Sequence, residues 1–240
     1  MKLSLLIPAY NEAARIERTI EQILESLGQF PAPAEVLIVD DGSADDTARK
    51  VETIIAGRGD FRLLRLPANQ GKGAAVKAGV LASRGEAVLM SDADLSTPLS
   101  ELPRFLAALA DGADLVVGSR QLPESNLVRR QPWLRERAGL LFGGIVRRLL
   151  PVGVVDTQCG FKLFRGPAAR ELFQQVTITG FAFDVEVLLL AKLRGLRVRE
   201  LPVTWQNAEG SKVSILRHLP QVVRDVRRIR RNFRRGVYRP

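Results

Sequence analysis

The sequence predicts an α/β protein whose central sheet is mostly parallel and is flanked by helices on both faces. Short runs rich in Val, Leu and Ile, with the length of buried strands, alternate with segments of helical periodicity through the first half of the chain. This alternation is typical of parallel strands joined by helical crossovers. The chain has 240 residues, 46% of them hydrophobic, which is enough for one domain with a substantial core.

The expected elements follow in order along the chain. The strands are Leu3–Pro8, Glu35–Asp40, Phe61–Leu66, Glu86–Ser91 and Asp114–Gly118. The helices between them are Glu12–Leu27, Asp45–Ala56, Gly71–Ala82 and Ser100–Ala110. Ser43 is expected to start the second helix, because Asp46 follows it as an acceptor near the N-terminal amides. The more irregular second half predicts a helix over Phe183–Leu193 and a strand over Val198–Trp205.

The apolar segments are too short to predict a transmembrane helix, which needs about 18 uncharged residues. The longest candidate, Leu140–Val155, is interrupted by two arginines and a proline. The apolar run that begins at Met1 is too short for a signal peptide and is better explained as the first core strand. The single cysteine, Cys159, excludes an intrachain disulfide, fits a reducing compartment and is expected to be a buried thiol.

The net charge of +10 is concentrated in two stretches. Residues 212–240 hold one Lys and nine Arg against Asp225 alone, and residues 120–151 hold seven Arg against two Glu. In the first stretch, apolar residues at three- and four-residue intervals predict an amphipathic helix with a cationic face. These residues are Leu219, Val222, Val223, Val226, Ile229 and Phe233.

We therefore expect a main domain over residues 1–214 and a basic amphipathic C-terminal helix over residues 215–240 that is not an independent domain. Such a helix can bind an anionic membrane surface, with about 1 kcal/mol from each nearby Arg. The segment Trp133–Leu150 is a candidate for a second membrane contact. The alternative is an apolar stripe that packs on the domain beneath solvated arginines.

Polar or glycine-rich groups follow four of the expected strands, where open α/β sheets bind their ligands. They are Pro8-Ala9-Tyr10-Asn11-Glu12, Asp40-Asp41-Gly42-Ser43, Asn69-Gln70-Gly71-Lys72-Gly73 and Asp92-Ala93-Asp94. The paired carboxylates of Asp92 and Asp94 are costly to hold together unless a cation neutralises them. Mg²⁺ or Mn²⁺ fits, because such an ion takes one or two carboxylates together with phosphate oxygens. Solvated loop aspartates are the alternative for the triplet alone.

The other two charged groups point to a nucleotide and an anion. Asp40 and Asp41 can accept from a ribose hydroxyl or a base N–H, although Ser43 in the same motif fits a helix cap. Gly71-Lys72-Gly73 can place backbone amides and a lysine near an anion. An ordinary pair of loop glycines explains this last motif equally well when it is taken alone.

In their order and spacing, these four motifs resemble those of the family 2 glycosyltransferases, which have the GT-A fold. Motifs of the second half are similar to those of the dolichyl-phosphate glucosyltransferase branch, with the dolichyl-phosphate mannose synthases as near neighbours. They are Val117-Gly118-Ser119-Arg120, Asp156-Thr157-Gln158-Cys159-Gly160-Phe161-Lys162, Phe181-Ala182-Phe183-Asp184-Val185-Glu186, and Trp205 with Glu209-Gly210-Ser211-Lys212.

The resemblance implies inverting transfer of a hexose, with UDP-glucose as the expected donor, to a polyprenyl phosphate. It implies that Asp92 and Asp94 bind the metal and diphosphate. The donor site that it implies consists of Pro8, Tyr10, Glu12, Asp40, Asp41, Lys72 and Asp92. Ser96 stands where mannose synthases tend to have a glutamine, which argues against mannose. The membrane-spanning N-terminal segment of the eukaryotic glucosyl enzymes is missing, so we expect peripheral attachment to the cytoplasmic face of a membrane.

A phosphate acceptor needs cations more than a strong base, because its second pKa of about 6 leaves it largely ionised at neutral pH. The candidates for binding it are Arg120, Arg135, Arg137 and Lys212, with a solvated basic face as the alternative. The expected catalytic residues are Asp94, Asp184 and Arg120. Glu186 has two possible roles: it could act in the site, or its charge could complement the dipole at the helix N-terminus.

Other functions remain as alternatives. A mannose synthase-like enzyme would use GDP-mannose, and another family 2 transferase would use a non-lipid hydroxyl acceptor. A nucleotidyltransferase would carry a basic, glycine-rich loop after the first strand, which this sequence lacks. A nucleic-acid-binding protein is a further alternative, but the basic tail lacks the interleaved aromatic residues that would stack on bases, so no nucleic-acid partner is expected.

Overall fold

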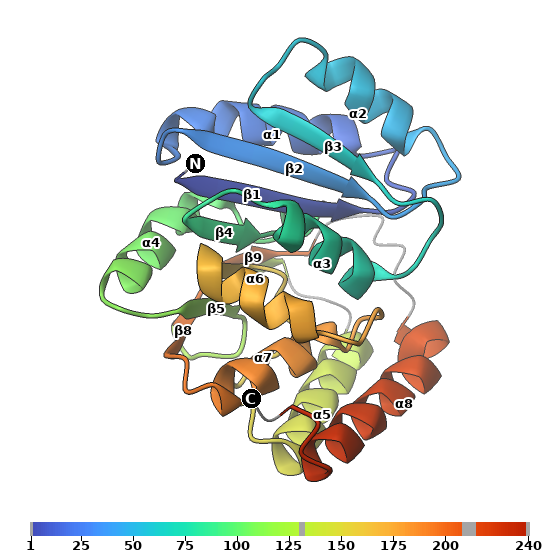
Figure 1. Ribbon diagram of the computed structural model, residues 1–240, viewed down its shortest axis with the longest axis vertical. Coiled ribbons are helices and arrows are strands. Elements are labelled where there is room, and N and C mark those ends of the chain that lie inside the picture. The colour runs from blue at the N-terminus through green and yellow to red at the C-terminus, as the bar shows by residue number, and fades with distance from the viewer. Residues whose placement is uncertain (1, 130–132, 208–214, 239–240) are drawn as a thin grey trace.

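The computed structural model describes residues 2–129, 133–207 and 215–238. A seven-stranded sheet in the order β3-β2-β1-β4-β7-β5-β8 forms its centre (Figure 1). All neighbouring strands are parallel except β7, which is antiparallel to both β4 and β5. The strands are β1 (Leu3–Ala9), β2 (Ala34–Asp40), β3 (Phe61–Arg65), β4 (Ala87–Met90), β5 (Leu115–Ser119), β7 (Lys162–Arg165) and β8 (Val198–Pro202). The prediction of a mostly parallel sheet is confirmed.

Helices cover both faces of this sheet, as predicted. One hydrophobic cluster joins the sheet to α1 (Ile16–Ser26), α2 (Thr47–Ile55) and α4 (Leu102–Ala110). The other cluster joins the opposite face to α3 (Lys72–Ala82), α6 (Gly166–Gln175) and α7 (Phe183–Leu193). Two short 3₁₀ helices, Leu27–Gln29 and Leu99–Glu101, complete the connections.

Two further helices, α5 (Trp133–Leu149) and α8 (Ile215–Arg234), lie side by side at one end of the molecule (Figure 1). Val226 and Ile229 of α8 are buried in the same cluster as α7, whereas Val223 is 37% exposed. The apolar stripe of α8 therefore packs on the domain over part of its length. Among the described residues, no helix is long and apolar enough to cross a membrane.

The strand expected over Val198–Trp205 is wrong as a single element. β8 ends at Pro202, and the N–H of Val203 makes one further bond to β5 by donating to Ser119 at 3.1 Å. The chain then enters a second, two-stranded sheet in which β9 (Thr204–Gln206) pairs with β6 (Asn126–Arg129). The backbone N–H of Thr204 donates to Glu101 at 3.0 Å, which fixes the point of departure.

The expectation that Ser43 starts the second helix is also wrong. α2 begins at Thr47, and Asp46 in the N-cap position forms no side-chain capping bond. The Ser43 hydroxyl instead accepts a hydrogen bond from the backbone N–H of Asn11 at 2.9 Å. Ser43 therefore joins two loops of the site rather than starting a helix.

Candidate active site

The loops that follow β1 and β2 are joined by reciprocal hydrogen bonds. Besides the bond to Ser43, the Asn11 side chain accepts from the N–H of Ala44 at 2.9 Å, and the N–H of Glu12 donates to Thr47 Oγ1 at 2.7 Å. Asn11 has a positive φ of 54°, a conformation that Asn tolerates better than most residues. This arrangement leaves Tyr10 44% exposed beside the end of β1, where Pro8 pairs with Val39. The carboxylate of Glu12 forms an ion pair with Arg15 at 2.5 Å.

Asp40 and Asp41 are both buried at the end of β2. Asp41 accepts hydrogen bonds from the backbone N–H groups of Gln70 at 2.9 Å and Gly71 at 2.8 Å, and from the Asn69 side chain at 3.0 Å. Burial raises the pKa of Asp41, and these backbone hydrogen bonds only partly offset it. Asp41 thus anchors the loop that leads into α3. The sequence predicted only a contact between Asp41 and a nucleoside, not this contact within the protein.

The glycines on either side of Lys72 allow α3 to begin against a neighbouring stretch of backbone. A Cβ on Gly71, whose φ is +103°, would lie 2.6 Å from the Thr179 carbonyl oxygen, and one on Gly73 would lie 2.6 Å from that of Ile178. Close packing against residues 178–180 therefore accounts for this glycine pair. It also fixes the helix start that carries Lys72, whose ammonium lies 2.5 Å from Asp92 Oδ1.

The carboxylates of Asp92 and Asp94 differ in their electrostatic surroundings. Burial acts to raise the pKa of Asp92, but Lys72, Lys162 and Arg120 together hold it below its usual value. The pKa of Asp94 is raised, first by burial and then by the charge of Asp92. Asp94 accepts a hydrogen bond from the N–H of Ser96 at 3.0 Å and forms no ion pair with a described residue. The pair thus carries negative charge that Lys72 neutralises only in part.

This pair fits a divalent ion that also binds phosphate oxygens. In the described part of the chain, no cluster of three or more His, Cys, Asp or Glu side chains could hold a metal by itself. An ion bound through Asp92 and Asp94 could complete its coordination with phosphate oxygens of a substrate, as Mg²⁺ does when it binds through one or two carboxylates and a phosphate group. The backbone at Gly160 packs closely against the carboxylate of Asp92, because a Cβ on Gly160 would lie 2.0 Å from Asp92 Oδ2.

Arg120, directly after β5, is held by a buried carboxylate. Its Nε and Nη2 donate to Asp156 at 2.7 and 2.8 Å, and its backbone N–H donates to the same carboxylate at 3.0 Å. The guanidinium also lies 5.7 Å from the centre of the Trp205 ring. Burial alone would lower the pKa of Arg120, but Asp156 raises it. The structure thus fixes a permanent cation close enough to lower the pKa of Asp92.

Asp184, in the first turn of α7, forms a buried ion pair that the sequence did not reveal. Lys162 donates to Asp184 Oδ1 at 2.6 Å and to the carbonyl oxygen of Cys159 at 2.5 Å. Burial raises the pKa of Asp184, and the charges of Lys162 and Lys72 offset it only in part. Cys159 is buried as predicted, and burial raises the pKa of its thiol to about 11.

The structure brings most of the predicted site residues to one edge of the sheet. Lys72, Asp92, Asp94, Arg120 and Asp184 are close enough to influence one another's pKa values. Arg137 is exposed on α5, whereas the side chain of Arg135 and all of Lys212 lie outside the described residues. Sequence reasoning missed Asp156 and Lys162 as charged partners. The signal for both was their place in the motif that runs from Asp156 to Lys162.

The chain is similar to known proteins along most of its length. The family model described as Glycosyl transferase family 2 matches residues 4–173. The dolichyl-phosphate beta-glucosyltransferase of Dictyostelium discoideum is 36% identical over 99% of this chain and 76% of its own length. The human dolichyl-phosphate beta-glucosyltransferase is 33% identical, over 99% of this chain and 78% of its own length.

A solved structure shares the fold at lower identity. Glucosyl-3-phosphoglycerate synthase from Mycobacterium tuberculosis, in complex with Mn²⁺, UDP and glucosyl-3-phosphoglycerate, superposes with a TM-score of 0.67. It is 22% identical, and the match covers 95% of this chain and 78% of the synthase. The GT-A fold expected from the motifs is confirmed. The chain therefore belongs to glycosyl transferase family 2.

Proposed function

We propose that this glycosyltransferase moves glucose from UDP-glucose to a polyprenyl phosphate, with Mg²⁺ or Mn²⁺ at Asp92 and Asp94. The observation that carries the proposal is the division of charge in the site. The carboxylates of Asp92 and Asp94, with Lys72 beside them, offer a place for a metal ion, and Arg120, fixed by Asp156, offers a separate positive charge. Similarity along nearly the whole chain to dolichyl-phosphate beta-glucosyltransferases supports glucose as the sugar and a lipid phosphate as the acceptor.

The donor half of the site binds the diphosphate of the nucleotide sugar. When bound, the divalent ion would neutralise the charge that develops on the leaving nucleoside diphosphate. Asp92 and Asp94 would hold this ion, and Lys72 would add a second positive charge next to the phosphates. Tyr10 lies exposed beside the buried Asp40 and Asp41, which supports a nucleoside site that also includes Pro8 and Glu12.

The acceptor half of the site binds a phosphomonoester, the phosphate of the lipid. Nε and Nη2 of Arg120 bind Asp156, and Nη1 forms no hydrogen bond with a described residue, so it remains available to an acceptor oxygen. An ionised phosphate oxygen would attack C1 of the glucose with inversion, and the C1–O bond electrons would leave with the nucleoside diphosphate. Because the acceptor brings no proton to remove, the step needs no strong general base.

Asp184 then acts by positioning rather than as a base. Its carboxylate is bound by Lys162, and both side chains are almost fully buried. A carboxylate held this way keeps Lys162 near Asp92, where its charge helps to keep Asp92 ionised. In this proposal, Arg137 on α5 and the predicted Arg135 and Lys212 supply further positive charge on the acceptor side.

The direct test measures transfer of labelled sugar into an organic-extractable polyprenyl phosphate, in parallel reactions with UDP-glucose, UDP-galactose, GDP-mannose and UDP-N-acetylglucosamine. We expect label from UDP-glucose with Mg²⁺ or Mn²⁺, and loss of transfer when EDTA removes the metal. Transfer from GDP-mannose alone would replace glucose by mannose. If no donor labels the lipid phosphate, the lipid acceptor is wrong.

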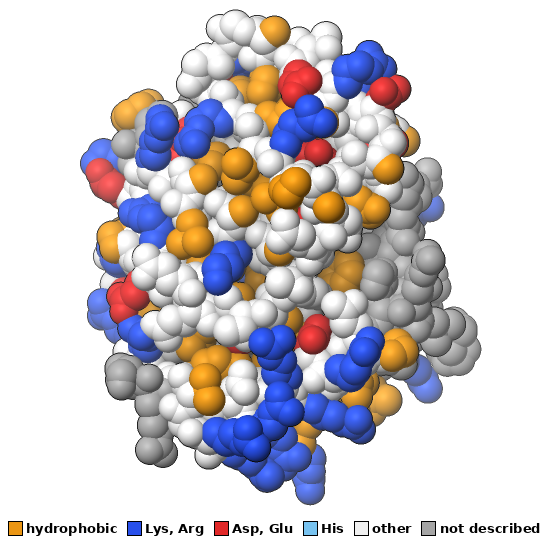
Figure 2. All heavy atoms as spheres, turned by 45° about the vertical axis from the view of Figure 1, so that its right-hand side comes forward, with side chains coloured by type: hydrophobic (Ala, Val, Ile, Leu, Met, Phe, Trp, Pro, Cys, Tyr) orange, Lys and Arg blue, Asp and Glu red, His pale blue; other side chains and the backbone are white. Residues whose placement is uncertain are grey.

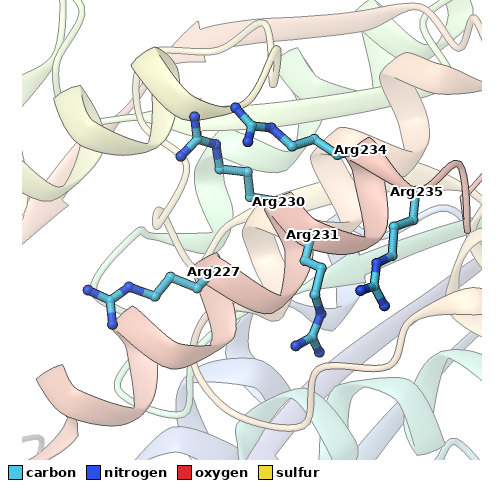
Figure 3. Close-up of a pocket in the computed structure, with 5 residues that line it drawn as sticks. All are labelled: Arg227, Arg230, Arg231, Arg234 and Arg235. Atoms are coloured by element: carbon cyan, nitrogen blue, oxygen red, sulfur yellow. The ribbon is translucent and has the colours of Figure 1, made fainter.

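Membrane attachment belongs to the same proposal. A groove of about 350 Å³ along α8 is lined by four arginines of this helix and by the residue after it: Arg227, Arg230, Arg231, Arg234 and Arg235 (Figure 3). None of the five forms an ion pair with a described carboxylate. Lys and Arg side chains also gather at the lower end of the surface in Figure 2. We infer peripheral binding of this face to anionic lipids on the cytoplasmic side of a membrane.

Replacement of two of these arginines should weaken vesicle binding specifically. Each Arg near an anionic surface contributes about 1 kcal/mol, so Arg227→Gln/Arg231→Gln should lower the partition coefficient on phosphatidylserine vesicles about 30-fold. Arg18→Gln/Arg84→Gln makes the same change of charge at exposed positions in α1 and in the loop after α3, and is the matched control. Sedimentation with vesicles measures both. Equal losses in the two variants would contradict attachment through α8.

A further inference from the structure

The inner side of α8 and the residues after it are linked to the donor half of the site. Tyr238 is 3% exposed, and its hydroxyl donates to Glu186 Oε1 at 2.7 Å. Glu186, on α7, is fully buried and also accepts from the N–H and hydroxyl of Thr177 and from the N–H of Ile178, each at 2.8 Å. Four donors thus converge on one carboxylate, which fixes the backbone at residues 177–178.

That stretch of backbone supports the start of α3. The carbonyl oxygens of Ile178 and Thr179 lie where a Cβ on Gly73 or Gly71 would be only 2.6 Å away, and the N–H of Ala74 donates to Thr179 at 3.2 Å. Lys72 lies between these two glycines. A shift of residues 177–179 would therefore move the ammonium of Lys72, which lies 2.5 Å from Asp92.

α8 contacts the same segment a second time. A Cβ on Gly180 would lie 2.9 Å from Gln221 Nε2 and 3.1 Å from Asp225 Oδ2. The side of α8 that carries Gln221 and Asp225 therefore packs against Gly180. This glycine directly follows residues 177–179 of the same segment. The same helix bears the arginine groove along its solvent-exposed surface (Figure 3).

We propose that Glu186 and Tyr238 are positioning residues that hold segment 177–180 against α3 and so place Lys72 for donor binding. The chain of contacts runs from Tyr238 through Glu186, Thr177 and the two glycines to Lys72 and Asp92. It makes donor affinity depend on the hydrogen bonds that Glu186 forms with Tyr238, Thr177 and Ile178. The inference rests on the proposed function in one respect, namely that Lys72 and Asp92 bind the donor diphosphate.

Tyr238→Phe tests this role, because it removes one hydrogen bond and keeps the ring that packs in the core. Binding of UDP in the presence of Mn²⁺ should weaken about fivefold to tenfold, measured by calorimetry well below the unfolding temperature. The KM for the sugar donor should rise by a similar factor, while the KM for the lipid phosphate stays unchanged. Glu186→Gln replaces one accepting carboxylate oxygen by an NH₂ group, which would face a hydrogen-bond donor. This variant should therefore have a larger effect on UDP binding and on the donor KM.

Ile229→Val is the matched control. Ile229 is fully buried on α8, lies outside the hydrogen-bond network and loses one methyl group, so the variant should lower Tm without changing the affinity for UDP and Mn²⁺. If Tyr238→Phe lowers Tm but leaves UDP binding and the donor KM unchanged, Tyr238 has only a structural role and the inference is wrong. If Ile229→Val weakens UDP binding as much, the inference is wrong as well. Failure of the unaltered protein to bind UDP with Mn²⁺ would instead contradict the donor site itself, and with it the positioning role.

Discussion

Asp94→Asn should remove almost all turnover and leave the folded protein at least as stable as before. A metal bound to the donor supplies several kcal/mol of charge stabilisation in the transition state, so loss of one ionic ligand should lower kcat by about 10³-fold. The amide keeps the size of the side chain and can still accept from the N–H of Ser96. Sugar transfer measures the first effect, and thermal unfolding measures the second.

The expected stability follows from the direction of the pKa shift. Burial and Asp92 raise the pKa of Asp94, so the ionised carboxylate destabilises the folded state relative to the unfolded chain. This destabilisation is absent below the unfolded pKa, near 3.8, and develops as the pH rises through the higher folded value. The Tm of Asp94→Asn relative to the unaltered protein should therefore rise between about pH 4 and neutrality.

Asp92→Asn is the informative comparison, because it changes the neighbouring carboxylate in the same way. Lys72, Lys162 and Arg120 outweigh burial and lower the pKa of Asp92, so its charge stabilises the fold above the unfolded pKa. We expect Asp92→Asn to lose turnover and also to lower Tm, a deficit that disappears as the pH falls through the folded pKa. Retained turnover in Asp94→Asn would contradict the metal assignment. Equal changes of Tm in the two variants would contradict the electrostatic asymmetry of the pair.

The sequence predicted the parallel part of the fold because its first four strands are short runs rich in apolar residues, and each is followed by a helix. All five strands expected in the first half exist, with ends within one residue of the expected ones. β7 was not predicted, because its four residues begin with Lys162 and end with Arg165. Its position between β4 and β5 depends on pairing between segments distant in sequence, which local periodicity does not encode.

The same limit explains what was missed in the site. Asp92 and Asp94 follow a parallel strand, so the rule that ligands bind at the carboxyl ends of strands located them. Lys162 starts an antiparallel strand, and its pairing with Met90 and Val117 brings it to the edge where β4 and β5 end. Glu186 looked like a helix-terminal charge, but the contact that defines it comes from Tyr238, 52 residues further along the chain.

Lys162→Met should destabilise the protein by about 3–5 kcal/mol, because it leaves Asp184 buried without its ion-pair partner. The two side chains are 1% and 4% exposed, so water cannot replace the lost ammonium. Methionine has nearly the length of the lysine side chain and avoids a large cavity. Unfolding in urea measures the change, which should appear as a lower midpoint with an unchanged slope.

The double variant Lys162→Met/Asp184→Leu separates stability from catalysis. Replacement of a buried ion pair by apolar side chains of similar volume is often neutral or stabilising, so the double variant should recover most of the lost stability. It should not recover turnover, because both charges act on the donor side. Lys162 helps to keep Asp92 ionised, and Asp184 helps to raise the pKa of Lys72. Recovery of turnover together with stability would show that the pair only supports the fold. If the double variant is as unstable as Lys162→Met, the loss comes from packing around β7 rather than from an unpaired charge.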